Sequence, residues 1–230
     1  MDRKKNAQGS LEFREWGGKR KGAGRKPTGR RAGVPHRVRV EVDASIPVHV
    51  TWRLLDEVRD IRRKGIWKEI RAAMRSGKER FGFRLLQLSL QNGHIHAIAE
   101  GDDSEAFRRG MQGLTIRLAR AINRAKRRRG RVFADRFHSR MVGTPREVRG
   151  VLVYVLNNAR KHGSMWGGDL LEDDRVDGFS TAPWFDGWRS HVSPAPPRDE
   201  PPPIAEPKSW LARTGWKRYG LLCPTDTPAS

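Results

Sequence analysis

The stretch Ser89-Leu90-Gln91-Asn92-Gly93-His94-Ile95-His96-Ala97-Ile98-Ala99 decides the fold, because it places a tight turn between two apolar segments. Asn-Gly is the strongest short signal for a two-residue hairpin turn. Side chains alternate between the two faces of a strand, so His94 and His96 are expected on one face. Two imidazoles placed in this way can share one divalent cation. The stretch therefore predicts an antiparallel hairpin with a candidate metal site on one face.

The segments around this hairpin predict an α+β fold. Their apolar spacing alternates between the periods of strands and of helices. The expected elements are a strand at 48–52, a helix at 54–76, strands at 81–90 and 94–99, a helix from 104 that ends at Gly130, a strand at 132–142 and a helix at 144–163. This order is that of a ferredoxin-like split βαβ unit, an antiparallel sheet with helices on one face, extended by one C-terminal helix.

The last of these helices has the clearest start signal in the chain. Thr144-Pro145-Arg146-Glu147 supplies an N-cap threonine, a proline at the first helical position and a glutamate at the third. Tyr154 falls outside the apolar stripe of this helix, so the core does not require it. Asn158 follows four residues later and is expected on the same helix face as Tyr154. Paired histidines and an isolated tyrosine on a basic helix suggest cleavage of a DNA strand through a phosphotyrosine.

The charge balance points to nucleic acid as the partner. The 230 residues include 47 Lys and Arg against 26 Asp and Glu, a net charge of +21. Cys223 is the only cysteine, which excludes an internal disulfide and a cysteine-built zinc site and fits a reducing compartment. No apolar stretch approaches the roughly 20 residues that span a bilayer. We expect no membrane contact and a cytoplasmic location, in a bacterium with the nucleoid.

Composition divides the chain into three parts. Residues 1–36 are expected to be a disordered basic arm, 37–190 the folded domain, and 191–230 a proline-rich flexible tail. Within the arm, Gly22-Ala23-Gly24-Arg25-Lys26-Pro27 is similar to short basic hooks that enter the minor groove of DNA. Arg25 and Lys26 are therefore candidate DNA contacts, and a merely solvated tail is the alternative.

Further DNA contacts are expected on the long helix and on the strand that follows it. No acidic residue occurs between Glu105 and Asp135, so one face of the helix is basic throughout. Side chains expected to follow the phosphate backbone are Arg117, Arg120, Arg124, Lys126, Arg127 and Arg128. Side chains expected nearer to the scissile phosphate are Arg136, His138 and Arg140.

Three stretches together resemble the single-tyrosine HUH transposases, and specifically the REP-associated tyrosine transposases. They are residues 89–96 with the two histidines, Phe133-Ala134-Asp135-Arg136-Phe137-His138-Ser139-Arg140, and Tyr154-Val155-Leu156-Asn157-Asn158-Ala159-Arg160-Lys161-His162. The resemblance extends over about residues 35–190. It implies a ferredoxin-like nuclease domain, a 5′-phosphotyrosine intermediate and single-stranded hairpin DNA as substrate, from palindromic repeats that flank the gene.

The resemblance also assigns roles to individual residues. Tyr154 would be the nucleophile, and His94 and His96 would bind the metal. Asn158 would be the third ligand, in a place where related enzymes often use glutamine, and Asn157 beside it is an alternative. Imidazole favours Mn²⁺, whereas the abundance of Mg²⁺ in cells favours Mg²⁺, so either ion is expected.

Two other functions fit parts of the pattern. A ferredoxin-like module could bind nucleic acid without cleaving it, although such a module needs neither the histidine pair nor the tyrosine. A rolling-circle replication initiator uses the same metal motif, often with paired tyrosines, and the only other tyrosine here is Tyr219, in the expected tail. A monomer and a homodimer are both compatible with the sequence.

Overall fold

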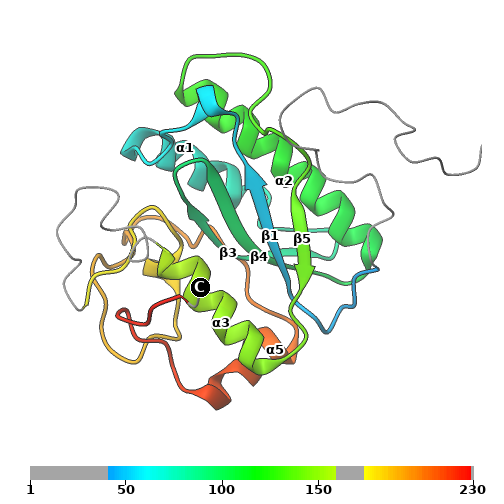
Figure 1. Ribbon diagram of the computed structural model, residues 1–230, viewed down its shortest axis with the longest axis vertical. Helices are drawn as coiled ribbons and strands as arrows, with labels where there is room; N and C mark the ends of the chain where they lie inside the picture. The colour runs from blue at the N-terminus through cyan, green and yellow to red at the C-terminus, as the bar shows by residue number, and fades with distance from the viewer. Residues whose placement is uncertain (1–40, 159–173, 229–230) are drawn as a thin grey trace, which may run out of the picture. The chain divides into compact units, whose positions relative to one another are not determined.

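The computed structural model describes residues 41–158 and 174–228, and within these ranges five strands form one antiparallel sheet (Figure 1). The strand order is β2-β3-β4-β1-β5. The strands are β1 (Val48–Arg53), β2 (Glu79–Arg80), β3 (Phe83–Leu90), β4 (His94–Gly101) and β5 (His138–Met141). The predicted hairpin is confirmed, since β3 and β4 pair with Leu90 opposite Ile95.

Two helical connections make the fold ferredoxin-like. Helix α1 (Lys64–Arg75) leads from β1 toward the β2–β3 edge, and α2 (Ser104–Ala125) leads from β4 to β5. Strand β4 lies between β1 and β3, and β1 lies between β4 and β5. Each connection therefore passes over one intervening strand, as in a split βαβ unit. The expected α+β class is confirmed.

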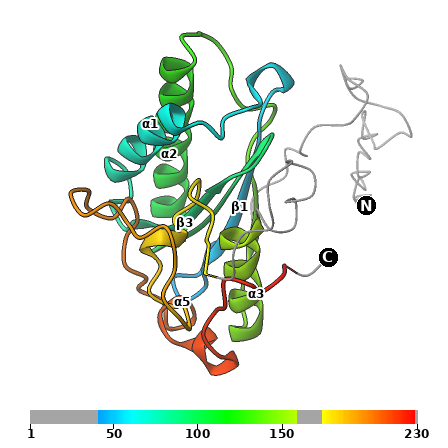
Figure 2. The same ribbon diagram turned by 90° about the vertical axis from the view of Figure 1, so that its left-hand side faces the viewer.

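Alternation along the strands builds a separate apolar core on each face of the sheet. Val50 and Trp52 face α1 and α2, whereas Leu86 and Ile98 face the third helix, α3 (Pro145–Leu156). Figure 2 shows α1 and α2 on one side of the sheet and α3 on the other. Helix α3 thus covers the face that does not carry the two ferredoxin helices.

Several predicted elements differ in their bounds, among them the long helix, which ends at Ala125 and not at Gly130. Helix α1 begins at Lys64 rather than 54, because the amides of Leu54 and Leu55 bond to main-chain carbonyls of Gly93 and Val132 and continue the extended chain of β1. A 3₁₀ turn, η1 (Asp56–Val58), follows. Strand β5 covers only part of 132–142. The strand predicted at 81–90 begins only at Phe83, because Phe81 and Gly82 have positive φ angles and form a turn.

The break before β5 has a local cause. The guanidinium of Arg131 donates to the carbonyls of Phe133 and Ala134, and the carboxylate of Asp135 accepts from the amide of Arg136. These bonds turn the chain away from the regular ladder. The predicted end of the last helix, near 161–163, lies outside the described residues; α3 itself ends at Leu156.

The expectation of a flexible tail from residue 191 onward is wrong for the described residues up to 228. This segment contains helix α5 (Trp210–Arg213) and the 3₁₀ turn η4 (Gly215–Tyr219), and the turn η3 (Ala182–Trp184) precedes it. Trp216 is 1% exposed and Leu222 is fully buried. Both pack into the core beneath α3. Large apolar side chains thus hold a segment whose prolines suggested a loose linker.

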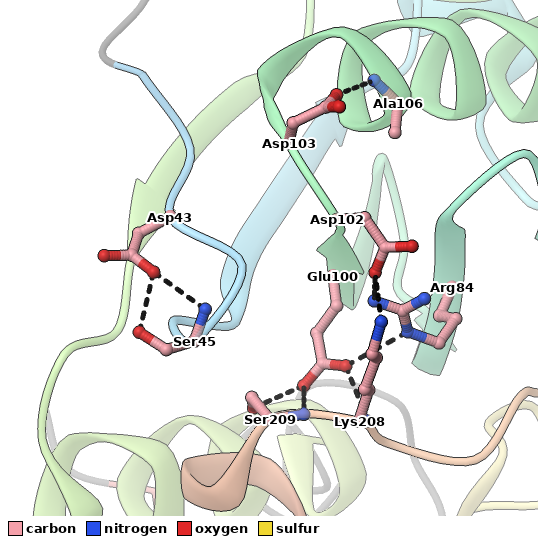
Figure 3. Close-up of polar contacts among 9 residues, drawn as sticks. All are labelled: Asp43, Ser45, Arg84, Glu100, Asp102, Asp103, Ala106, Lys208 and Ser209. Atoms are coloured by element: carbon pink, nitrogen blue, oxygen red, sulfur yellow. Dashed lines mark hydrogen bonds and ion pairs between the residues drawn. The ribbon is translucent and has the colours of Figure 1, made fainter.

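A buried carboxylate fixes the same segment to the sheet (Figure 3). Glu100, at the end of β4, accepts hydrogen bonds from the amides of Lys208 and Ser209 and from the Ser209 hydroxyl. Arg84 on β3 donates to Glu100 and, at 2.7 Å, to Asp102. Hydrogen bonds from Arg84 and Lys208 hold the pKa of Asp102 below its usual value. We call these five residues the Glu100 cluster.

Candidate active site

The two histidines of the hairpin lie on the sheet face covered by α3. Their neighbours Ile95 and Ala97 point into the core beneath α1 and α2, so His94 and His96 point the opposite way. The two imidazole centroids are 6.2 Å apart. His94 is exposed and His96 is 7% exposed. The alternation of side chains along β4 therefore places His94 and His96 on one face, as predicted.

Tyr154, on helix α3, faces this histidine pair. The capping box of Thr144 and Glu147 is present and fixes the start of α3. Two and a half turns later, the Tyr154 ring lies edge-on to the His96 ring, with centroids 5.1 Å apart. A strand and a helix more than fifty residues apart in the sequence thus bring a phenol and an imidazole into contact.

The consecutive asparagines after α3 have different environments. Asn157 donates both amide hydrogens, to the carbonyl oxygens of Cys223 and Asp226, each at 3.0 Å. Asn158 is 1% exposed, and its Oδ1 atom has no hydrogen-bond partner in the part of the chain that the structure describes. Asn158 lines the cleft although it lies beyond the last residue of α3. Asn158, and not Asn157, is therefore placed for a role in the cleft.

One cleft of about 730 Å³ brings these residues together. Its lining consists of His49, Thr51, Arg59, Gln91, Asn92, His94, His96, His138, Tyr154 and Asn158. The set includes the four residues predicted from the sequence to act in chemistry. Tyr219 does not line it and is 54% exposed on η4, which disfavours a two-tyrosine mechanism.

His49 is the titratable imidazole of the cleft that sequence reasoning missed. Its ring stacks on that of His96 and meets that of Tyr154 edge-on, with both pairs of centroids 5.7 Å apart. Burial, together with the nearby Arg140 and His138, lowers the pKa of His49 to about 4. His49 is therefore neutral at pH 7. Its position between Val48 and Val50 in a strand was a usable signal, because alternation puts it on the polar face.

Thr51 orients one of the predicted ligands. Its hydroxyl oxygen lies 3.2 Å from Nδ1 of His96, which is directly opposite it in the β1–β4 ladder. When Nδ1 carries the proton and donates it to Thr51, the lone pair of Nε2 is the one that can bind a metal ion. Such a second hydrogen bond commonly fixes the tautomer and the ring orientation of a metal-binding histidine.

The donor set of the cleft fits a divalent cation with open coordination positions. Among residues 41–158 and 174–228, no three His, Cys, Asp or Glu side chains come together as a metal site. A metal ion in the cleft would thus depend on His94, His96 and an amide oxygen. The Oδ1 atom of Asn158, which is buried without a partner among the described residues, would be that third donor, and two imidazoles with one oxygen suit Mn²⁺.

The basic residues predicted to bind DNA occupy different places. His138 lines the cleft, and Arg140, two residues along β5, pairs with Glu147 at 2.9 Å. The basic residues of α2 belong to the helix on the opposite face of the sheet, where Arg124 pairs with Glu69. Arg136 lies in the turn before β5. Arg25 and Lys26 lie outside the described residues.

The C-terminal end of α2 is the part of that helix nearest to the cleft. Lys126 donates through Nζ to the carbonyl of Arg59, and Arg59 lines the cleft. Arg127 and Arg128 follow directly, whereas Arg117 and Arg120 lie on the body of the helix. The structure therefore links Lys126 to a residue of the cleft, whereas Arg127 lines a separate hollow together with Arg63 and Glu69.

Fold and cleft together define a class: ferredoxin-like α+β domains in which a histidine pair on a central strand faces a tyrosine on a covering helix. Residues 44–158, half of the chain, match the family model described as IS200-like transposase. The chain belongs to this family. The matched range includes every residue that lines the cleft and ends at Asn158.

No curated protein matches the chain. The chain is similar to a solved structure of a REP-associated tyrosine transposase bound to a REP hairpin, with 16% sequence identity and a TM-score of 0.44. The similarity covers 61% of this chain and 85% of that one.

No helix within the described ranges is long and apolar enough to cross a membrane.

Proposed function

We propose that this chain is a metal-dependent transposase that cleaves and rejoins single-stranded, hairpin-containing DNA through a 5′-phosphotyrosine on Tyr154. The observation that carries the proposal is the convergence of Tyr154, His94, His96 and Asn158 in one cleft. Membership of the IS200-like transposase family supports the reaction class. The net charge of +21 supports a nucleic-acid substrate.

In the proposed step, the Tyr154 hydroxyl oxygen attacks the phosphorus of the scissile phosphodiester. A bond forms between this oxygen and phosphorus, and the bond from phosphorus to the 3′-oxygen breaks. The tyrosine loses its proton, and the departing 3′-oxygen gains one. Because the phosphotyrosine remains a phosphodiester, attack by a second 3′-hydroxyl rejoins DNA and releases Tyr154 without ATP.

His94, His96 and Asn158 would hold the divalent cation, Mn²⁺ or Mg²⁺. When bound, the cation polarises the phosphate and stabilises charge on the leaving oxygen. Thr51 would keep the ring of His96 oriented. The edge-on contact with His96 would keep the Tyr154 ring next to the phosphate. The exposure of His94 leaves an approach for the DNA backbone.

The experiment that tests this function measures a covalent adduct. Hairpin oligonucleotides from the flanks of the gene are labelled at either the 5′ or the 3′ end and mixed with the protein and Mn²⁺ or Mg²⁺. Products are separated on a denaturing protein gel. We expect a labelled protein band with the 3′ label only, because a 5′-phosphotyrosine retains the downstream fragment. The band should disappear with chelator.

Tyr219→Phe is the matched control for Tyr154→Phe, because it removes the same hydroxyl from the chain's other tyrosine, outside the cleft. Tyr154→Phe and the His94→Ala/His96→Ala double variant should form no adduct, whereas Tyr219→Phe should retain it. Tight binding of several flanking hairpins without an adduct in either metal would instead favour a non-catalytic nucleic-acid-binding protein.

A further inference from the structure

A segment outside the family match lies along the helix that carries Tyr154. We call residues 220–226 the C-terminal strap. Arg149, in the first half of α3, donates to the carbonyl of Gly220 at 3.1 Å and pairs with the Asp226 carboxylate at 2.8 Å. Asn157, directly after α3, donates to the carbonyls of Cys223 and Asp226. Side chains eight residues apart, about 12 Å along a helix, therefore hold one strap.

The strap has its own internal bracing. The Asp226 carboxylate accepts from the amide of Cys223 at 3.1 Å, and the Asp226 amide donates to the Cys223 carbonyl at 2.9 Å. This closed turn presents the two carbonyls that Asn157 binds. Asn157 is 3% exposed, so loss of those acceptors would leave its buried amide group without these two hydrogen-bond partners, which is unfavourable.

The far side of the strap is fixed to the body of the domain. Leu222 is fully buried in the core beneath α3. Its amide donates to the carbonyl of Gly187, and its carbonyl accepts from the amide of Arg189 at 2.8 Å. The strap is therefore bonded to α3 on one side and to the 187–189 segment on the other.

Helix α3 needs this second attachment. It has twelve residues, a length at which an isolated helix is marginal in water. Val148, Val151, Leu152 and Val155 form one buried stripe, yet Val153 and Leu156 are buried as well. A helix covered by the sheet alone would leave one side exposed. The second buried side belongs to the C-terminal segment, which packs against α3 through η4.

We propose that Asn157, Arg149 and Asp226 are positioning residues: the strap fixes the end of α3 so that Tyr154 and Asn158 meet His94 and His96 of the same chain. The inference rests on the proposed function for the reaction that it serves. Asn157 is the step between the two regions, because it follows Tyr154 by three residues and directly precedes Asn158. Its amide is bound by the strap, and the next residue points into the cleft.

The test separates misplacement of the nucleophile from loss of folded protein. Asn157→Leu removes one attachment, and Asp226→Ala independently removes the other. The matched control is Glu200→Ala, which breaks the ion pairs to Arg71 and Arg75 on α1 without touching α3. Adduct formation is followed under single-turnover conditions at saturating hairpin DNA, together with the dissociation constant for the same DNA.

We expect both strap variants to lower the rate constant of adduct formation by about tenfold or more, because misplacement of a reacting group by an ångström is costly. The amplitude of the reaction and the DNA dissociation constant should stay within about twofold of the control. A merely structural role would lower the amplitude, since fewer molecules would be folded, and would leave the rate constant unchanged. That second pattern overturns the inference.

Hydrogen exchange of the α3 amides provides a readout that needs no catalysis. Amides at 148–157 should exchange at least about tenfold faster in both strap variants than in the control. If the wild-type chain forms no adduct, the proposed function fails, and exchange then decides on the strap alone. Unchanged protection overturns the strap, and lost protection in both variants supports it.

Discussion

The active-site cleft and the Glu100 cluster are both polar, and they differ in how completely their buried atoms are hydrogen-bonded. In the Glu100 cluster, both carboxylate oxygens have partners, and the carboxylate is fully buried. In the cleft, Nε2 of His49, both amide atoms of Gln91 and Oδ1 of Asn158 are buried with no partner within the described residues.

This difference separates a structural site from a binding site. A buried polar group without a partner costs about 1–3 kcal/mol, and several such groups line the cleft. The Glu100 cluster avoids this cost, because its buried carboxylate is paired with Arg84 and accepts hydrogen bonds from Lys208 and Ser209. Stability alone does not account for the polar wall of the cleft, whereas a ligand that completes its hydrogen bonds or its coordination does.

The largest expected effect comes from breaking the Glu100 cluster. Glu100→Ala leaves Arg84 and the amides of Lys208 and Ser209 without their buried acceptor. Loss of one partner of a buried ion pair typically costs about 3–5 kcal/mol, so the free energy of unfolding should fall by that amount in urea titrations. The control is Glu105→Ala, which breaks exposed pairs to Arg108 and Arg109.

Glu105→Ala should change the free energy of unfolding by less than about 1 kcal/mol. If the two variants lose similar amounts, the Glu100 cluster is no more structural than a surface pair, and the contrast with the cleft collapses.

Local sequence patterns correctly predicted the features that depend on neighbouring residues. Alternation placed His94 and His96 on one face, and the Thr144 capping box placed the start of α3 correctly. The anchoring of the C-terminal segment could not be predicted, because Glu100 and Ser209 are 109 residues apart. The proline content of this segment led to the wrong prediction of a flexible tail, because it indicates the stiffness of the backbone and not which side chains are buried or hydrogen-bonded.

A substitution in the cleft should leave stability unchanged or raise it, unlike Glu100→Ala. Asn158→Leu removes a buried amide oxygen that has no hydrogen-bond partner within the described residues, so the metal-free protein should unfold at the same temperature as the wild type or at a higher one. The same change should weaken Mn²⁺ binding about tenfold or more, because one of three protein donors is lost. Isothermal titration with Mn²⁺ and thermal unfolding without metal give the two numbers.

Gln91→Leu is the matched control for Asn158→Leu. It removes from the same cleft a buried amide whose two polar atoms have no partner within the described residues, at a position that we do not assign to the metal. Both variants should have similar thermal stability, and only Asn158→Leu should lose Mn²⁺ affinity. Equal Mn²⁺ affinity in the two variants would remove Asn158 from the ligand set.

The smallest expected effect concerns the basic face of α2 and asks which part of it belongs with the cleft. Arg127 and Arg128 directly follow Lys126. The ammonium group of Lys126 donates to the main-chain carbonyl of Arg59, which lines the cleft. Each phosphate contact with single-stranded DNA contributes about 0.7 to the slope of log K against log salt. Arg127→Gln/Arg128→Gln should therefore flatten that slope by about 1.4, measured by fluorescence anisotropy across a salt series.

Arg108→Gln/Arg109→Gln is the control with the same loss of charge, at the other end of α2, where Glu105 already pairs with both arginines. Its slope should stay close to that of the wild type. Guanidiniums that are already paired with a carboxylate neutralise fewer DNA phosphates, so fewer counterions leave the DNA on binding. Equal flattening in both variants would mean that the whole helix responds to net charge and that no DNA path runs from the cleft to the end of α2. Flattening in the first variant alone would assign the DNA contact to the C-terminal end of α2 and not to its start.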